Sequence, residues 1–266
     1  MKAALRSEFR KLFSTRIWWI LLVGMVGYLG FIGVTFGFSI TASSTTTDSG
    51  SPALGGAEAA KALYGFVSSI GYVFPLVIGS LMVTTEFRHK TITQTLLAEP
   101  RRGVFLAAKL LASVPVGILF GLAGTATIVA AGAPVLAISG DGAYLSDPDV
   151  LLVLLFDVVV TALWAVLGAS FGLLVTQQVA AIVLILAFTQ FVEPVARVVL
   201  GSIDSLAGLA SYLPGGAADS LVGASFFAEL GTGDLLPRWG GALVFLGYIA
   251  VFATLGRLTT LRRDVG

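Results

Sequence analysis

Apolar residues in this chain occur as long continuous runs, without the alternation or one-sided spacing of soluble strands and helices. Three of these runs contain no Asp, Glu, Lys or Arg, and they cover residues 17–40, 62–84 and 110–138. Each exceeds the roughly 20 residues that an α-helix needs to cross about 30 Å of hydrocarbon. The pattern predicts an all-α polytopic membrane protein.

Three further spans are weaker. Residues 150–175 contain one charged residue, Asp157, and residues 239–258 form a slightly short span near the C-terminus. The segment 179–198 carries Glu193 and Pro194 after its uncharged first part. We include it because the spans on either side would otherwise have inconsistent orientations. The prediction is one transmembrane domain of six spans over residues 1–266.

Lys and Arg set the predicted orientation, because positively charged loops stay in the cytoplasm. With both termini cytoplasmic, all 16 Lys and Arg residues fall on the inner side except Lys61, Arg197 and Arg238. We therefore expect a multi-pass protein of the cell membrane, which is the cytoplasmic membrane in a bacterium. The basic N-terminus precedes an apolar run much longer than the about 7 to 15 residues of a signal peptide, which predicts an uncleaved first span.

The composition disfavours several classes of function. The net charge is only +1 and the basic residues are spread along predicted membrane edges, so we expect no nucleic acid partner. With no cysteine and one histidine, His89, the chain lacks the residues for a thiolate or histidine metal cluster. A phosphate-binding P-loop needs glycine directly before lysine, and none of the lysines follows glycine. We expect no catalytic site, cofactor or metal on this chain.

Three predicted spans carry pairs of glycines four residues apart, a spacing that lets helices approach closely. The pairs are Gly33 with Gly37, Gly117 with Gly121, and Gly168 with Gly172. We expect packing within the chain for each pair, in preference to a dimer interface.

The segment between the fifth and sixth spans, residues 200–238, is moderately apolar. Its stretches 200–213 and 217–230 are too short to span, and Pro214, Gly215 and Gly216 separate them. The interpretation is a pair of short outer helices that lie on the membrane face or re-enter it. The alternative is a helical hairpin on the surface.

The first 16 residues have an amphipathic pattern. Leu5, Phe9 and Phe13 recur at helical spacing while Arg6 and Arg10 take other positions. This pattern predicts a helix along the cytoplasmic membrane interface. The alternative is a simple topology anchor for the first span.

The cytoplasmic segment 85–109 has a second helical pattern. Phe87, Thr91 and Leu96 lie roughly along one face of a helix over residues 86–97, and Arg88 points elsewhere. Pro100 ends this helix, because proline forces the residue before it out of the helical region. The prediction is a short helix that docks a soluble partner. An ordinary basic loop is the alternative.

Two carboxylates lie inside predicted spans, Asp157 and Glu193, both in the outer half of the membrane. Such groups usually face a bundle interior or an aqueous cavity. They are candidates for contact with a cationic or polar substrate, or for proton binding. In the alternative, Glu193 pairs with Arg197 one turn further on, and Asp157 stays hydrated near the interface.

The cytoplasmic segment carries a family resemblance. Its pattern resembles the loop after the second span of ABC-2-type transporter permeases, on residues Glu86, Arg88, Thr91, Leu96, Leu97, Pro100, Arg102 and Lys109. The N-terminal helix, the six spans and the outer re-entrant segment extend the resemblance over the whole chain. One departure is Lys90, where the family commonly has glycine.

The resemblance implies the permease of an ATP-driven exporter with the type V exporter fold, for a drug, antibiotic, lipid or polysaccharide. It implies two ABC ATPase subunits that carry ATP and Mg, and a second permease copy or homologous permease in the bilayer. The coupling residues it implies are Glu86, Phe87, Arg88, Thr91, Ile92 and Leu96, with Arg6, Phe9 and Arg10 in the interfacial helix. A proton-coupled secondary transporter that uses Asp157 and Glu193 is the alternative. A membrane enzyme is disfavoured, because no catalytic constellation is evident.

Overall fold

The computed structural model describes residues 2–45, 56–98, 100–138, 142–203, 205–225 and 235–260. Every regular element over these ranges is helical. Six helical segments are long and apolar enough to cross a membrane, which confirms the predicted number of spans. The doubtful fifth span is among them, as a continuous helical segment from Gln178 to Gly201.

Four of the spans are single helices. They are α2 (Ile17–Thr45), α6 (Arg102–Ile138), α7 (Pro148–Leu174) and α12 (Arg238–Thr259). The start of α7 follows directly from its sequence: the Asp147 side chain accepts from the backbone N–H of Asp149 at 2.8 Å, and Pro148 occupies the first helical position. Aspartate before proline is a favourable helix start, because proline needs no hydrogen-bond acceptor there.

The other two spans are composite, and each contains a π-helical segment. The second span runs through α3 (Gly56–Tyr64), η1 (Val67–Gly71) and α4 (Val73–Arg88). The fifth runs through α8 (Gln178–Ala187), η2 (Phe188–Val192) and α9 (Glu193–Gly201). Wide π-helical turns of this kind are rare and are frequent at functional sites.

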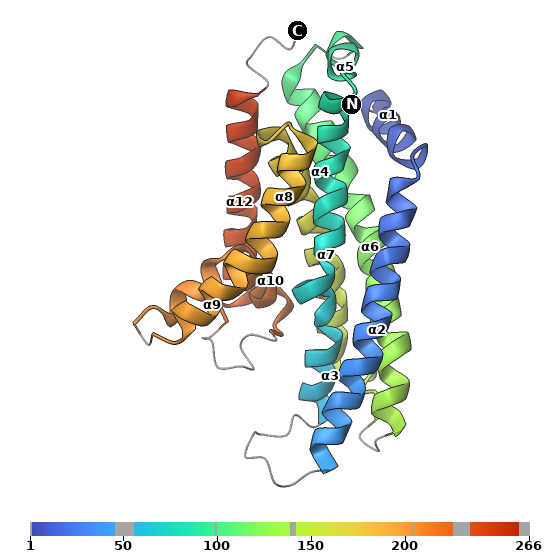
Figure 1. Ribbon diagram of the computed structural model, residues 1–266, viewed down its shortest axis with the longest axis vertical. Coiled ribbons are helices and arrows are strands. Elements are labelled where there is room, and N and C mark those ends of the chain that lie inside the picture. The colour runs from blue at the N-terminus through green and yellow to red at the C-terminus, as the bar shows by residue number, and fades with distance from the viewer. Residues whose placement is uncertain are drawn as a thin grey trace.

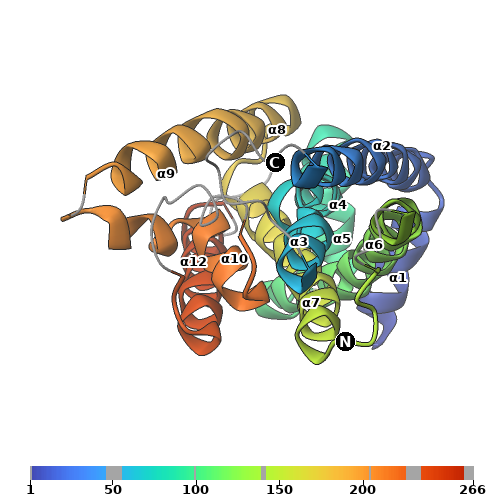
Figure 2. The ribbon, with the colours of Figure 1, turned by 90° about the horizontal axis from the view of Figure 1, so that it is seen from below.

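The spans form an elongated bundle (Figure 1). The N-terminal helix α1 (Lys2–Phe13), the short helix α5 (Ile92–Ala98) and the last turns of α12 lie at one end, here called the terminal end. Helix α3 lies at the opposite end. The view along the bundle in Figure 2 shows α8 and α9 running along one side of the molecule, and α9 slants away from the bundle axis.

The tightest packing in the bundle is between α4 and α7, where backbone meets backbone. A Cβ atom added to Gly168 would lie 2.0 Å from the carbonyl oxygen of Leu76, and one added to Gly79 would lie 2.0 Å from that of Ala165. Gly117 faces Ala162 on α7 in the same way, and Gly33 faces Ala131 on α6. The three glycine pairs therefore pack within the chain, as predicted.

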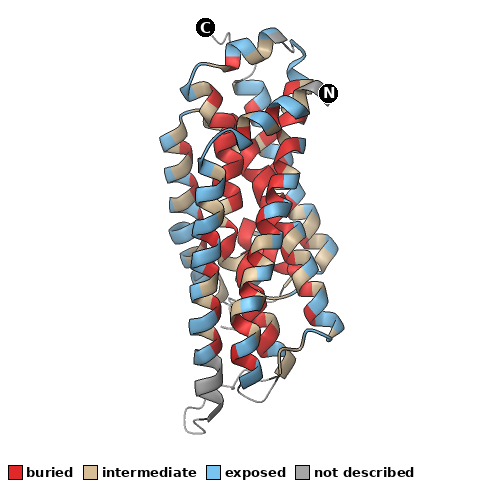
Figure 3. Cartoon of the chain, turned by 90° about the vertical axis from the view of Figure 1, so that its right-hand side faces the viewer, coloured by how far each residue is buried: buried red, intermediate tan, exposed pale blue. Residues whose placement is uncertain are grey.

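Aromatic residues fill the core beside this contact. The fully buried Trp164 stacks on Tyr72, with ring centroids 4.3 Å apart, and meets the ring of Phe245 edge-on at 4.9 Å. Figure 3 shows buried residues along the middle of the bundle and exposed ones along its outer sides. The exposed side chains include large apolar ones such as Phe31, 67% exposed, as expected of a surface that faces lipid.

The segment between the fifth and sixth spans is folded into the bundle. It forms a 3-10 helix, η3 (Ala207–Tyr212), and α10 (Pro214–Val222), which ends at Gly223 with φ +82°. All nine residues of α10 are buried, and the helix packs on α12 and α7. A helical hairpin on the surface is therefore wrong for α10. The predicted second helix over 217–230 begins earlier and ends earlier, and residues 226–234 lie outside the described ranges.

We expect Gly168→Ala to lower the free energy of unfolding by about 1–3 kcal/mol, because its methyl group forces α4 and α7 apart. Gly247→Ala on α12 is the control, since a Cβ there meets nothing within 4 Å. Denaturant titration in mixed micelles measures both variants. Equal stability of the two would contradict the assigned helix contact.

Candidate functional site

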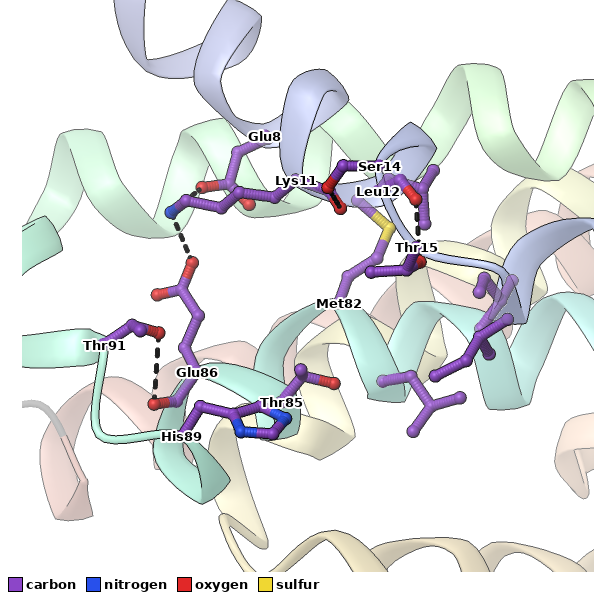
Figure 4. A pocket seen from close by; sticks show the side chains of 13 residues that line it. Glu8, Lys11, Leu12, Ser14, Thr15, Met82, Thr85, Glu86, His89 and Thr91 are labelled. Atoms are coloured by element: carbon purple, nitrogen blue, oxygen red, sulfur yellow. Dashed lines mark hydrogen bonds and ion pairs between the residues drawn. The ribbon is translucent and has the colours of Figure 1, made fainter.

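Four charged residues form a closed ring at the terminal end. Lys109 on α6 donates to Glu8 of α1 at 2.5 Å and to Glu86 of α4 at 2.6 Å. Lys11 of α1 donates to the same two carboxylates, at 3.1 Å to Glu8 and 2.6 Å to Glu86. These four residues, here called the charged ring, connect α1 to two spans. Figure 4 shows Lys11 between Glu8 and Glu86.

The charged ring is largely buried. The side chain of Lys109 is 1% exposed, and those of Glu86 and Glu8 are 5% and 6% exposed. Lys109 also donates to the carbonyl oxygen of Met82 at 2.9 Å, so its three N–H groups all have acceptors. Burial of charge is costly unless the groups are paired and hydrogen-bonded. Oε2 of Glu86 is the exception in the charged ring, because it has no hydrogen-bond partner among the described residues.

Lys11 extends the charged ring to α5. Its third hydrogen bond goes to Oγ1 of Thr95 at 3.2 Å. Partial burial lowers the pKa of Lys11, but the hydrogen bond to Glu86 and the charge of Glu8 outweigh this, so the pKa lies above its usual value. Lys11 therefore keeps its charge at neutral pH, and the link between α1, α4 and α5 is electrostatic.

A cavity of about 280 Å³ lies beside the charged ring, between α1 and α4. Figure 4 shows Glu8 and Lys11 on its α1 side and Met82, Thr85 and Glu86 on its α4 side. Because the side chains of α1 do not fill this cavity, the attachment of α1 to the bundle here depends strongly on the four charged residues.

The predicted continuous helix over residues 86–97 is wrong, because the chain turns between α4 and α5. The backbone N–H of Thr91 donates to the carbonyl of Glu86 at 2.9 Å, and that of Lys90 to the carbonyl of Phe87 at 3.2 Å. This is the Schellman arrangement, which needs a left-handed residue after the helix. Lys90 is that residue, with φ +55°. Glycine adopts this conformation freely, whereas a residue with a Cβ atom does so at a cost.

The residues expected to couple to a partner divide into inner and outer groups. Glu86 and Ile92 are buried, at 4% and 3% exposure, so they hold α5 to the bundle and are not available to a partner. Phe87, Thr91 and Leu96 are half-buried. Arg88 is exposed and donates to Oε1 of Gln178 at 3.2 Å.

The exposed face of α5 contains Leu97, a residue that is not among the expected coupling residues. Leu97 is 79% exposed, at the tip of the terminal end, and Gln94 beside it is exposed as well. Ile92 on the other face packs with Val83 and Phe105. Helix α5 is thus clamped on one side and open on the other.

The predicted interfacial residues lie on the open side of α1. Arg6 and Arg10 are exposed, and Phe9 is half-buried and stacked on Phe13 with centroids 6.4 Å apart. Leu12 is buried in the core, and the partly buried Leu5 packs against the same cluster. Arginine beside aromatic rings suits the boundary between lipid headgroups and acyl chains.

A second cluster of polar residues lies within the spans, around a cavity of about 220 Å³ here called the polar cavity. Its polar lining includes Ser69, Tyr72, Gln190, Glu193, Arg197 and Asp219. Both π-helical segments reach it, η1 through Ser69 and η2 through Gln190. The wide turns thus bring polar side chains of two spans to one place.

Asp219 of α10 is the centre of this cluster. It accepts from Arg197 at 2.7 Å, from Ser225 at 2.6 Å and from Ser69 at 3.2 Å. Arg197 therefore pairs with Asp219, and the expected pair of Arg197 with Glu193 is wrong within the described ranges. Glu193 instead accepts the backbone N–H of Gly215 at the start of α10 with Oε1, while Oε2 has no partner among the described residues.

Asp157 is fully buried, so the expectation that it stays hydrated near the interface is wrong. Neither carboxylate oxygen has a hydrogen-bond partner of good geometry among the described residues. Ser68 of η1 is the polar group that faces it, and Asp219 is close enough to act on it electrostatically. Asp157 and Glu193 thus belong to one acidic region, although only Glu193 lines the polar cavity.

Sequence reasoning missed several members of both sites. Glu8 gave a weak signal as the single acidic residue in the basic first 16 residues. Ser68 with Ser69, and Thr189 with Gln190, are adjacent polar pairs inside predicted spans and were available as signals. Asp219 gave none, because it lies in the segment 200–238 between two predicted spans and not within a span.

Comparison with known proteins adds no identification: no protein-family model matches the chain, and no curated protein matches its sequence. Any functional assignment rests on the charged ring with α5 and on the polar cavity.

We expect Lys109→Met to lower the free energy of unfolding by about 3–5 kcal/mol, because it leaves buried carboxylates without their partner. Lys61→Met is the matched control, since Lys61 pairs with Glu58, whose side chain is 63% exposed, and should cost less than about 1 kcal/mol. Denaturant titration in micelles tests both. Similar values for the two variants would argue against a structural role of the charged ring.

We expect Lys90→Gly to raise the free energy of unfolding by about 1 kcal/mol, because glycine has no Cβ penalty in the left-handed region. Lys90→Ala removes the same charge but keeps the Cβ, so it should give no gain. The same titration compares them, and a gain shared by both variants would assign the effect to charge instead.

Proposed function

We propose that this chain is the membrane permease subunit of an ATP-driven transporter of the ABC-2 type. The observation that carries the proposal is the mounting of α5, which is clamped to the bundle through Ile92 and Thr95 and exposes Leu97 at the terminal end. A short helix of this kind suits the transfer of motion from a soluble partner to the spans.

The charged ring supplies the connection that such a partner needs. A displacement of α5 acts on Lys11 through Thr95, and Lys11 shares Glu86 with Lys109. The motion therefore reaches α1, α4 and α6 together. Because Oε2 of Glu86 has no hydrogen-bond partner among the described residues, the ring is not fully satisfied, which eases its rearrangement.

The topology of the proposal follows from the positions of the basic residues. Basic residues gather at the terminal end: Lys90 lies in the turn between α4 and α5, and α1, α6 and α12 carry Arg10, Arg102 and Arg257. By the positive-inside rule we propose that this end faces the cytoplasm. The cell membrane is then the location, with both termini inside.

ATP and Mg belong to the partner, because no lysine of this chain follows glycine as a P-loop requires. The complex we propose contains two ABC ATPase subunits and a second copy of the permease, or a homologous permease. Closure of the ATPases pushes on α5, the charged ring moves the spans, and a pathway between the two permeases changes its exposure. Export of a drug, antibiotic, lipid or polysaccharide is the direction that the family resemblance favours.

A second candidate is a proton-coupled secondary transporter. Asp157 and Glu193 favour it, because both are buried carboxylates with oxygen atoms that lack partners among the described residues. Intramembrane carboxylates of this kind occur in proton relays. This candidate needs no ATPase and gives the exposed face of α5 no role.

The test is affinity capture of the chain from its native membrane in mild detergent, followed by an ATPase assay of the eluate. We expect ATPase activity with the wild-type chain, and at least about tenfold less with Leu97→Glu, because a charge replaces an exposed apolar anchor. Leu145→Glu is the control, a 40% exposed leucine outside the terminal end.

Loss with Leu97→Glu and retention with Leu145→Glu would support the coupling role of α5. An oligomeric chain without any ATPase would contradict the proposal and favour the proton-coupled candidate. Direct reversal of Glu86 is unsuitable, because that residue is buried in the charged ring.

A further inference from the structure

Two cavities of opposite character adjoin each other within the spans. The first is the polar cavity, of about 220 Å³. The second, here called the apolar cavity, has about 360 Å³ and is lined mainly by Leu76, Trp164, Phe171, Leu184, Phe188 and Phe252. Thr189 lines both cavities.

Tyr72 and Trp164 form the boundary between the two cavities. The hydroxyl of Tyr72 lines the polar cavity and donates to the carbonyl of Thr189 at 3.1 Å. The ring of Tyr72 stacks on Trp164, which lines the apolar cavity. A molecule with one polar end can therefore contact both cavities by displacing few groups.

The polar cavity has an excess of acceptors and of negative charge. Arg197 is the single cation among the described residues that line it, and its partner is Asp219. Glu193 shares the charge of Arg197 with Asp219 and has no direct ion pair among the described residues: it is 2% exposed, and its Oε2 has no hydrogen-bond partner among them. A buried carboxylate whose charge is only partly compensated is unfavourable and is resolved by a further cation or a proton.

The other polar residues that line the polar cavity favour a cation that donates hydrogen bonds over one that has no donor. The hydroxyl groups of Ser69 and Tyr72 and the amide of Gln190 surround the carboxylate region. An ammonium group has three donors and no acceptor, which suits a site rich in oxygen atoms. An anion would meet two carboxylates, and a neutral polar group would leave the charge of Glu193 only partly compensated.

We infer that the polar cavity binds the ammonium group of a lipophilic amine, with Glu193 as its counter-ion and the apolar cavity holding its hydrocarbon part. Pockets of a few hundred Å³ with apolar walls and a few convergent polar groups are typical of small-molecule sites. This inference deepens the proposed function, on which it rests, because it gives the chemical class of the cargo.

The test uses the purified full chain in lipid nanodiscs, with no ATPase present. The probes are 4-phenylbutylammonium and 4-phenylbutan-1-ol, which share their hydrocarbon part, and binding to empty nanodiscs of the same lipid is subtracted. The amine stays protonated at neutral pH. We expect it to bind at least about tenfold more tightly than the alcohol, from one compensated buried charge.

The variant Glu193→Gln keeps the size of the side chain and removes its charge. It should weaken binding of the amine at least about tenfold and leave the alcohol unchanged. Glu58→Gln is the matched control, because Glu58 is exposed on α3 and pairs with Lys61. Leu184→Ala in the apolar cavity should weaken the amine and the alcohol alike.

Equal binding of the two probes to the wild-type chain would overturn the inference, whether or not Glu193→Gln folds. Unchanged binding of the amine to a folded Glu193→Gln would overturn it as well, and would leave protonation as the state of that carboxylate. Because the assay contains only this chain, its failure is distinguishable from failure of the ATPase capture.

Discussion

The charge on Lys109 is the constraint on which the terminal end of the molecule depends. Its ammonium group lies almost without exposure between three helices, and its hydrogen bonds to Glu8, Glu86 and Met82 use all its donors. The apolar face of α1 fills only part of the space below it, because a cavity remains beside Leu12. Hydrophobic packing therefore leaves α1 incompletely fixed at this point. The paired charges give it one position, and through Lys11 they give α5 one position too.

The polar cavity is built in the reverse way, with polar groups that are only partly satisfied. Asp219 has three partners, whereas Glu193 and Asp157 keep atoms without partners among the described residues. The two sites thus lie at different heights of the same bundle and differ in how completely their charges are compensated. The α4–α7 contact joins them: α4 carries Glu86 at one end and continues from Tyr72 at the other, and its close packing on α7 at Gly168 makes it a rigid connection.

The spans could be predicted from the sequence because hydrophobic length is a local property, and even the fifth span emerged once its neighbours required it. The charged ring could not, because Lys109 and Glu8 are 101 residues apart and only the folded chain brings them together. The break between α4 and α5 was hidden by residue type: Lys90 adopts the conformation of a glycine, while Phe87, Thr91 and Leu96 keep helical spacing across the turn. The partner of Arg197 was missed because Glu193 is only one helical turn away in the sequence. Asp219 is 22 residues away and comes close to Arg197 only in the folded chain.

The two π-helical segments have a consequence for how this membrane protein accommodates polarity. A π turn contains one residue more than an α turn closed by the usual hydrogen bond, so the residues after it are rotated by about 100° relative to an uninterrupted helix. In the second span, the side chains of α4 are therefore rotated about the helix axis relative to those of α3, and Ser68 and Ser69 lie in the π-helical segment between the two helices. In the fifth span, the side chains on either side of Thr189 and Gln190 are rotated in the same way. Each π-helical segment therefore brings polar side chains to the polar cavity, while the apolar residues before and after it keep their surroundings: Leu63 and Leu76 of the second span are buried, and Val183 and Val195 of the fifth are exposed.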